Sequence, residues 1–156
     1  MKKIVLAVTL FLSSSVAWAS EWHGMGMNSD AIYFYDAATL RRDQSTIIVW
    51  VSMYKNSKTT KNAFSMLKIK EEVNCASREL RSLQILSYDV DGELLRSFDA
   101  PQKLKEPAPD TLGDSLVNDF CKAGFDPRDP QTISPDPASK AKEYFDWVKR
   151  QPQEKH

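Results

Sequence analysis

The sequence predicts an α+β domain, an antiparallel sheet with helices packed on it. Runs rich in β-branched and aromatic residues, which suit strands, fill most of the chain up to about residue 98. Helical apolar stripes appear only beyond residue 110. Strands followed by helices, without alternation between the two, are typical of this class.

Residues 1–19 have the three parts of a cleavable secretory leader. Two lysines precede an apolar run over 4–12, and small residues stand at Ala17 and Ala19, where a signal peptidase requires them. The run is shorter than the roughly 20 residues that span a bilayer. We therefore expect cleavage after Ala19 and export to the periplasm or medium. No lipid-accepting cysteine follows the cut, and no later segment suits a membrane span.

Removing 19 of the 156 residues would leave 137, a length that suggests one domain. Two of the 21 basic residues lie in the leader, so the mature chain would carry 19 basic and 21 acidic residues, a net charge of −2. Duplex binding needs a dense basic face. We therefore expect no nucleic acid partner.

Five strands follow from hydrophobic periodicity, at 31–35, 46–54, 65–73, 79–88 and 93–98. Residues 46–54 are apolar on both faces, which predicts a central strand covered on both sides, whereas lysines alternate with apolar residues in 65–73. Asp91-Gly92 indicates a hairpin in which both residues have positive φ. The polar residues 36–45 are expected to contain a turn.

Two helices are expected after the proline-containing loop at 100–109. The first spans 112–121, with Asp110 or Thr111 as its cap, and Gly124 fits its end. The second begins at Pro137 behind the cap Asp136. We divide the chain into the leader (1–19), an α+β domain (20–124), and a proline-rich extension with a C-terminal helix (125–156).

The two cysteines, Cys75 and Cys121, are expected to form a disulfide. In an oxidising compartment two such residues most often pair. Neither lies in a C-x-x-C unit, and no histidine is near either in the sequence, which argues against a reactive thiol or a metal pair. The apolar stripe of the first helix would turn Cys121 toward the sheet.

An ordered set of residues resembles the surface-adhesin protein E family of Gram-negative bacteria, over roughly 22–121. The set comprises Trp22, the run YFYD that ends at Asp36, Leu40-Arg41-Arg42, the strand that ends at Tyr54, Cys75, Arg78, Arg81, Tyr88, Asp91-Gly92 and Cys121. The resemblance implies a sheet of about six strands, one packed helix, the same disulfide and association as a homodimer. It also implies a role in binding host matrix proteins. The family's named adhesin is a lipoprotein, whereas this chain has no lipid-accepting cysteine, which favours a periplasmic or released protein.

No catalytic constellation stands out. The chain has two histidines, so a nucleophile–histidine arrangement has at most His23 as a base within the domain. G-x-S-x-G, H-E-x-x-H and phosphate-loop motifs are absent from the sequence. We expect a non-enzymatic protein without a cofactor, and a protein partner in the host matrix or the bacterial envelope.

His23, Met25 and Met27 form the one pattern with metal-binding chemistry. Imidazole and thioether ligands suit Cu(I), and in a regular extended segment the three side chains would point to one side. The alternative function is therefore a periplasmic copper or small-ligand carrier. The competing interpretation is an edge strand with buried methionines, whose glycines mark a bulge.

Two further surfaces are candidates for binding. The lysine-rich loop with Lys55, Lys58 and Lys61 could contact acidic glycans or matrix proteins, or could be a solvated hairpin tip. The last helix could dock on its own domain or on a partner.

Overall fold

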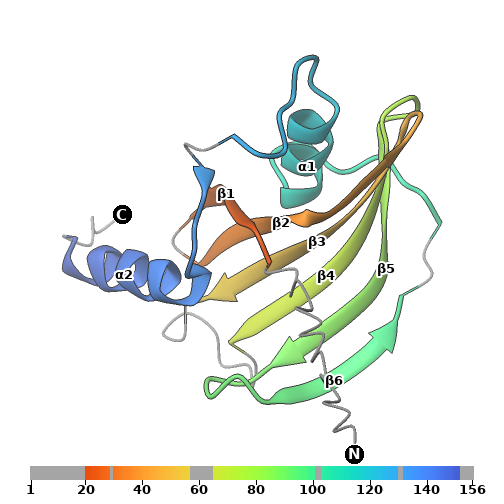
Figure 1. Ribbon diagram of the computed structural model, residues 1–156. Helices are drawn as coiled ribbons and strands as arrows, with labels where there is room; N and C mark the ends of the chain where they lie inside the picture. Colours follow the sequence, from red (N-terminus) through yellow and green to blue (C-terminus); the bar gives the residue numbers. More distant parts are fainter. Residues whose placement is uncertain (1–19, 29, 57–64, 101–102, 130–131, 152–156) are drawn as a thin grey trace, which may run out of the picture.

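The computed structural model describes residues 20–28, 30–56, 65–100, 103–129 and 132–151. Over these residues an antiparallel sheet runs in the order β1-β2-β3-β4-β5-β6, and two helices pack on it (Figure 1). Its strands are β1 (Trp22–Met27), β2 (Ala31–Asp43), β3 (Thr46–Lys55), β4 (Met66–Asn74), β5 (Glu79–Tyr88) and β6 (Leu94–Asp99), and its helices are α1 (Leu112–Phe120) and α2 (Pro137–Arg150). The predicted α+β class is confirmed, whereas the predicted leader lies outside the described residues.

The strand register sorts the side chains onto two faces, which we name after the helix that covers each. On the α1 face, Val51 pairs with Tyr35 and Ile69. The main core lies here, formed by Tyr35, Ala37, Ile47, Val49, Val51 and Val73 of the sheet with Leu116, Val117 and Phe120 of α1. On the α2 face, Ala141 and Phe145 of α2 pack on Ile32 and Phe34. Figure 1 shows α1 and α2 at different ends of the twisted sheet.

The helix α1 is fixed to the sheet by packing and by a disulfide. Thr111 caps it by accepting a hydrogen bond from the Asp114 amide. Cys121, directly after the helix, bonds to Cys75, directly after β4, across 46 residues of sequence. Closing a loop of this length stabilises a fold by about 4 kcal/mol in the chain-entropy model. The predicted disulfide is thus confirmed.

Three local expectations differ from the structure. The strand expected at 31–35 continues as β2 to Asp43, because the pairing with β3 resumes at Arg41 and Arg42 after an irregularity that follows Asp36. The turn expected within 36–45 is therefore confined to residues 44–45. The second face of β3 is only half-buried at Ile48 and Trp50, since α2 covers just one end of that face. In the hairpin at 91–92, Gly92 alone has positive φ.

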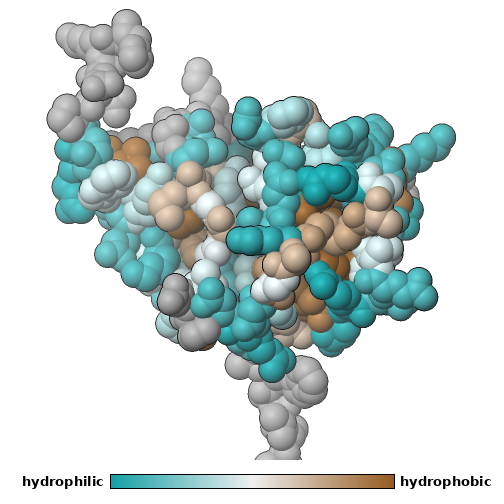
Figure 2. All heavy atoms as spheres, turned by 90° about the horizontal axis from the view of Figure 1, so that it is seen from above, coloured by the Kyte–Doolittle hydropathy of each residue, from teal (hydrophilic) through white to brown (hydrophobic). Residues whose placement is uncertain are grey.

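Seen from above, the α1 end of the molecule exposes hydrophobic as well as polar side chains. Figure 2 shows hydrophobic surface framed by hydrophilic side chains, with the larger part of it to the right of centre. Hydrophobic side chains are therefore exposed at this end in patches, which are interrupted by hydrophilic groups.

Glu71 of β4 is an acidic residue buried in the sheet. It lies between Val49 and Ser82 in the strand register, and 5% of it is exposed. One carboxylate oxygen accepts a hydrogen bond of 3.1 Å from Ser82, while Oε2 has no partner among the described residues. Burial raises the pKa of Glu71 from 4.5 to about 6, opposed by the Ser82 hydrogen bond.

This raised pKa predicts that stability falls between pH 4.5 and neutrality. The folded protein keeps the Glu71 proton to higher pH than the unfolded chain, so the contribution is complete below about pH 4.5 and is lost as the pH rises through about 6. A pKa difference of about 1.5 corresponds to about 2 kcal/mol. In urea titrations over pH 4–8, Glu71→Gln should flatten this slope and raise stability at pH 7.5. The exposed control Glu93→Gln should keep the slope, and an unchanged slope in Glu71→Gln would contradict the assignment.

Candidate functional site

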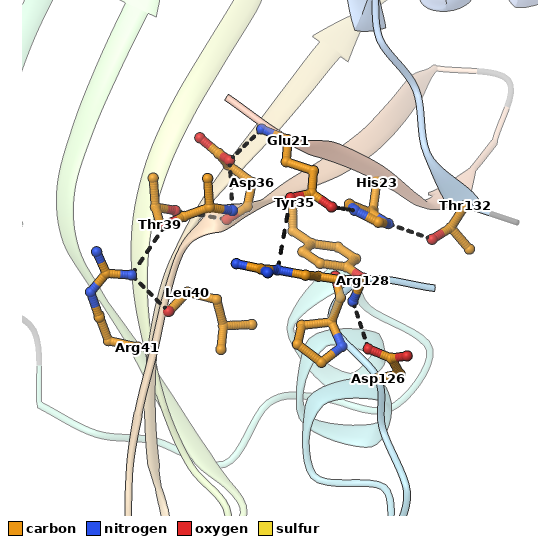
Figure 3. Close-up of polar contacts among 12 residues, drawn as sticks. Glu21, His23, Tyr35, Asp36, Thr39, Leu40, Arg41, Asp126, Arg128 and Thr132 are labelled. Atoms are coloured by element: carbon orange, nitrogen blue, oxygen red, sulfur yellow. Dashed lines mark hydrogen bonds and ion pairs between the residues drawn. The ribbon is translucent and has the colours of Figure 1, made fainter. Parts of the chain in front are cut away.

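His23 occupies the centre of a polar cluster at the β1 edge of the sheet (Figure 3). Its side chain has no exposed surface, and its ring stacks on Tyr35 with centroids 5.2 Å apart. Nε2 lies 3.2 Å from a carboxylate oxygen of Glu21, and Nδ1 lies 2.7 Å from the hydroxyl of Thr132. Because a carboxylate only accepts hydrogen bonds, Nε2 carries a proton.

The same cluster fastens the segment before α2 to the sheet. Ile133 forms an antiparallel bridge with His23, and the amide of Ser134 donates to the Trp22 carbonyl at 2.7 Å. Arg128 lies 3.8 Å from the Glu21 carboxylate, and the Tyr35 hydroxyl donates to the Pro127 carbonyl at 3.1 Å. Residues 132–134 thus add a short strand to β1, which Figure 1 shows beside it just before α2.

The predicted copper ligands are not brought together. Met25 is the extra residue of a bulge between Gly24 and Gly26, so His23 pairs with Tyr35 on the α1 face while Met27 pairs with Ile32 on the α2 face. Met25 packs against the main core, and both ring nitrogens of His23 have protein partners. The edge strand and the bulge of the competing interpretation are present, but Met27 is 59% exposed and not buried as that interpretation expected. The expectation that the three side chains share one side is wrong, because the bulge changes the register.

A groove of about 610 Å³ runs between β1, the added strand and α2. Its apolar lining is largely open to solvent, with Met27 59% exposed, Ile133 49% and Trp147 50%. Tyr144 stacks on Trp147 with ring centroids 5.9 Å apart and continues the aromatic wall. Residues 24–27 of β1 line the groove as well.

The side chains of this groove are of the types that dominate protein-binding surfaces. Trp, Tyr, Met and Arg are enriched at such surfaces, and Trp, Tyr and Arg carry most of the binding energy. Trp147, Tyr144 and Arg150 line the α2 wall, and Met25 and Met27 line the β1 wall. Lys140 on the rim is paired with Glu143 at 3.2 Å. The groove can therefore receive an apolar or aromatic segment of another protein.

The lysine loop is only partly described. Lys55 ends β3, whereas Lys58 and Lys61 lie outside the described residues. Its role as a binding site stays a prediction. None of the helices in the described ranges has the length and hydropathy needed to cross a membrane.

Sequence reasoning missed the groove because its walls are far apart in the chain. His23 and Thr132 are separated by 109 residues, and no periodicity links them. The available signal was the apolar face of the last helix, which was noted as a possible contact surface.

Comparison with known proteins identifies the family. A family model described as surface-adhesin protein E matches residues 22–122, well over half of the chain. No curated protein and no solved structure matches the chain significantly. The matched range contains the whole sheet, α1 and both cysteines, while the added strand and α2 lie beyond it. This chain belongs to the surface-adhesin protein E family.

Proposed function

We propose that this protein is exported, loses its leader after Ala19, and acts outside the cytoplasm as a non-enzymatic protein-binding module. Family membership supports an adhesin-like role. The observation that carries the proposal is the gathering of Met27, Ile133 and Trp147 around one groove, each about half exposed. Large apolar side chains exposed together typically mark a contact surface.

The partner segment would lie along β1 between Ile133 and Trp147. Residues 24–27 form an outer edge of the sheet, and such edges accept extended peptides by strand addition. The bridge between His23 and Ile133 shows that this edge takes up an additional strand. Host matrix proteins and envelope proteins are both candidates for the partner, and homodimer formation stays a prediction.

Export is tested by the N-terminal residue and the location of the protein. Expressed in a Gram-negative host, the mature chain should begin at Ser20 and appear in the periplasm or medium, because Ala17 and Ala19 fit the peptidase. Ala19→Arg should remain unprocessed. N-terminal sequencing of fractionated cells makes the measurement. An uncleaved cytoplasmic chain would contradict the proposal, and a strictly periplasmic one would leave an envelope protein as the partner.

Matrix binding is tested with the purified mature protein and immobilised vitronectin and laminin. We expect binding at micromolar concentration, weakened at least tenfold by Trp147→Ala, since loss of a hot-spot aromatic costs about 2 kcal/mol or more. Surface plasmon resonance with matched protein concentrations provides the affinities.

The matched control is Phe98→Ala on β6. Phe98 is 49% exposed, almost the same as Trp147, but it does not line the groove. Its removal should leave binding unchanged. Failure of the wild type to bind either protein would remove the host-matrix role, and equal losses in the two variants would remove the groove as the site.

A further inference from the structure

A second pocket, of about 460 Å³, lies on the α2 face of the sheet, in the part that α2 does not cover. Asp36, Trp50 and Lys70 are consecutive partners across β2, β3 and β4, and Arg41 pairs with Ile48 on the same face. These side chains line the pocket together with Ser20 and Thr39. The pocket thus combines a flat aromatic ring, two cations and a carboxylate.

The two cations are available to an anionic ligand. Nη1 of Arg41 donates to the Ala38 and Leu40 carbonyls at 3.1 and 3.0 Å, which holds the guanidinium in place (Figure 3). Within the described ranges neither Arg41 nor Lys70 forms an ion pair. An arginine anchored in this way can bind a carboxylate with its remaining N–H groups.

Asp36 adds a requirement for hydrogen-bond donors on the ligand. It is 4% exposed, and its Oδ1 accepts from the amides of Glu21 and Ala38 at 2.9 and 3.1 Å. Its Oδ2 has no hydrogen-bond partner among the described residues. An acidic side chain or a sulfate group by itself offers only acceptors and would leave this carboxylate without a donor. A ligand that suits the pocket must carry both a carboxylate and donating hydroxyl groups.

We propose that this pocket binds a uronic acid unit of an acidic polysaccharide. The sugar carboxylate lies against Arg41 and Lys70, a ring hydroxyl donates to Asp36, and the apolar face of the pyranose packs on Trp50. Pockets of this volume with few convergent polar groups are typical of small-ligand sites. Lys68, held 5.6 Å from the ring centroids of both Trp22 and Tyr88, lies two residues from Lys70 along β4 and extends the surface for a longer chain.

Export of the protein would strengthen binding at this pocket, and to this extent the inference rests on the proposed function. Cleavage after Ala19 would leave the α-ammonium group of Ser20 at the pocket, which Ser20 lines. This group would add a positive charge to those of Arg41 and Lys70 at the pocket. The binding measurement therefore uses the mature chain with a free Ser20 terminus.

The test is isothermal titration of that chain with three uronate oligosaccharides and one neutral glucan. Hyaluronan fragments are unsulfated and of host type, heparin fragments are sulfated, and alginate fragments are of bacterial type. We expect binding of hyaluronan or alginate and none of the neutral glucan, and the stronger of the two indicates the source. Arg41→Gln and Trp50→Ala should each weaken binding at least tenfold, with Arg41→Gln serving if Trp50→Ala fails to fold.

Two controls separate this pocket from general charge and from the groove. Arg96→Gln removes one positive charge from β6, away from the pocket, and Trp147→Ala alters only the groove; both should bind sugar as the wild type does. Absence of uronate binding, binding of heparin alone, binding of acidic peptides instead of sugar, or equal loss in Arg96→Gln would overturn the inference. None of these results changes the matrix-protein test, because that depends on Trp147.

Discussion

The arrangement of the groove between β1 and α2 depends on one buried side chain, His23. A polar ring without exposed surface needs partners on both nitrogens, and these come from Glu21 on one side and Thr132 on the other. The ring also stacks on Tyr35 of the main core. The contacts of His23 therefore fix β1, the core and the segment before α2 relative to one another, and the groove is the space that this arrangement leaves.

The two faces of the sheet have separate roles in this account. The α1 face is closed by α1 and the Cys75–Cys121 disulfide and supplies most of the buried apolar surface. The α2 face is covered at one end only, which leaves Trp50 and Lys70 half-buried and Arg41 exposed. Adhesin-like protein binding at the groove and sugar binding at the second pocket would then use opposite ends of the region around β1 and β2. Neither would disturb the core.

The sequence predicted what depends on local signals. The strands at 46–54 and 79–88 and the start of α2 at Pro137 match the structure within one residue, and the cap of α1 is Thr111, one of the two residues expected. Periodicity and caps are short-range properties, which is why the sequence predicts them. The full length of β2 was missed because its second half is polar and pairs through Arg41 and Arg42. The hydrogen bonds of the buried His23 were missed for a related reason, since its partner Thr132 lies 109 residues away. The groove was missed for the same reason, because it is lined by residues within 24–34 and 132–150, which are far apart in the sequence.

The most direct test of this account is amide hydrogen exchange at Ser134, whose N–H donates to the Trp22 carbonyl. Measured by NMR in the wild type, Thr132→Val and His23→Phe, exchange at Ser134 should become at least tenfold faster in both variants. Exchange at the central strand residues Val49 and Val51 should stay unchanged. If Ser134 keeps its wild-type protection in both variants, the segment before α2 docks on β1 without the contacts of His23, which contradicts the role given to this histidine.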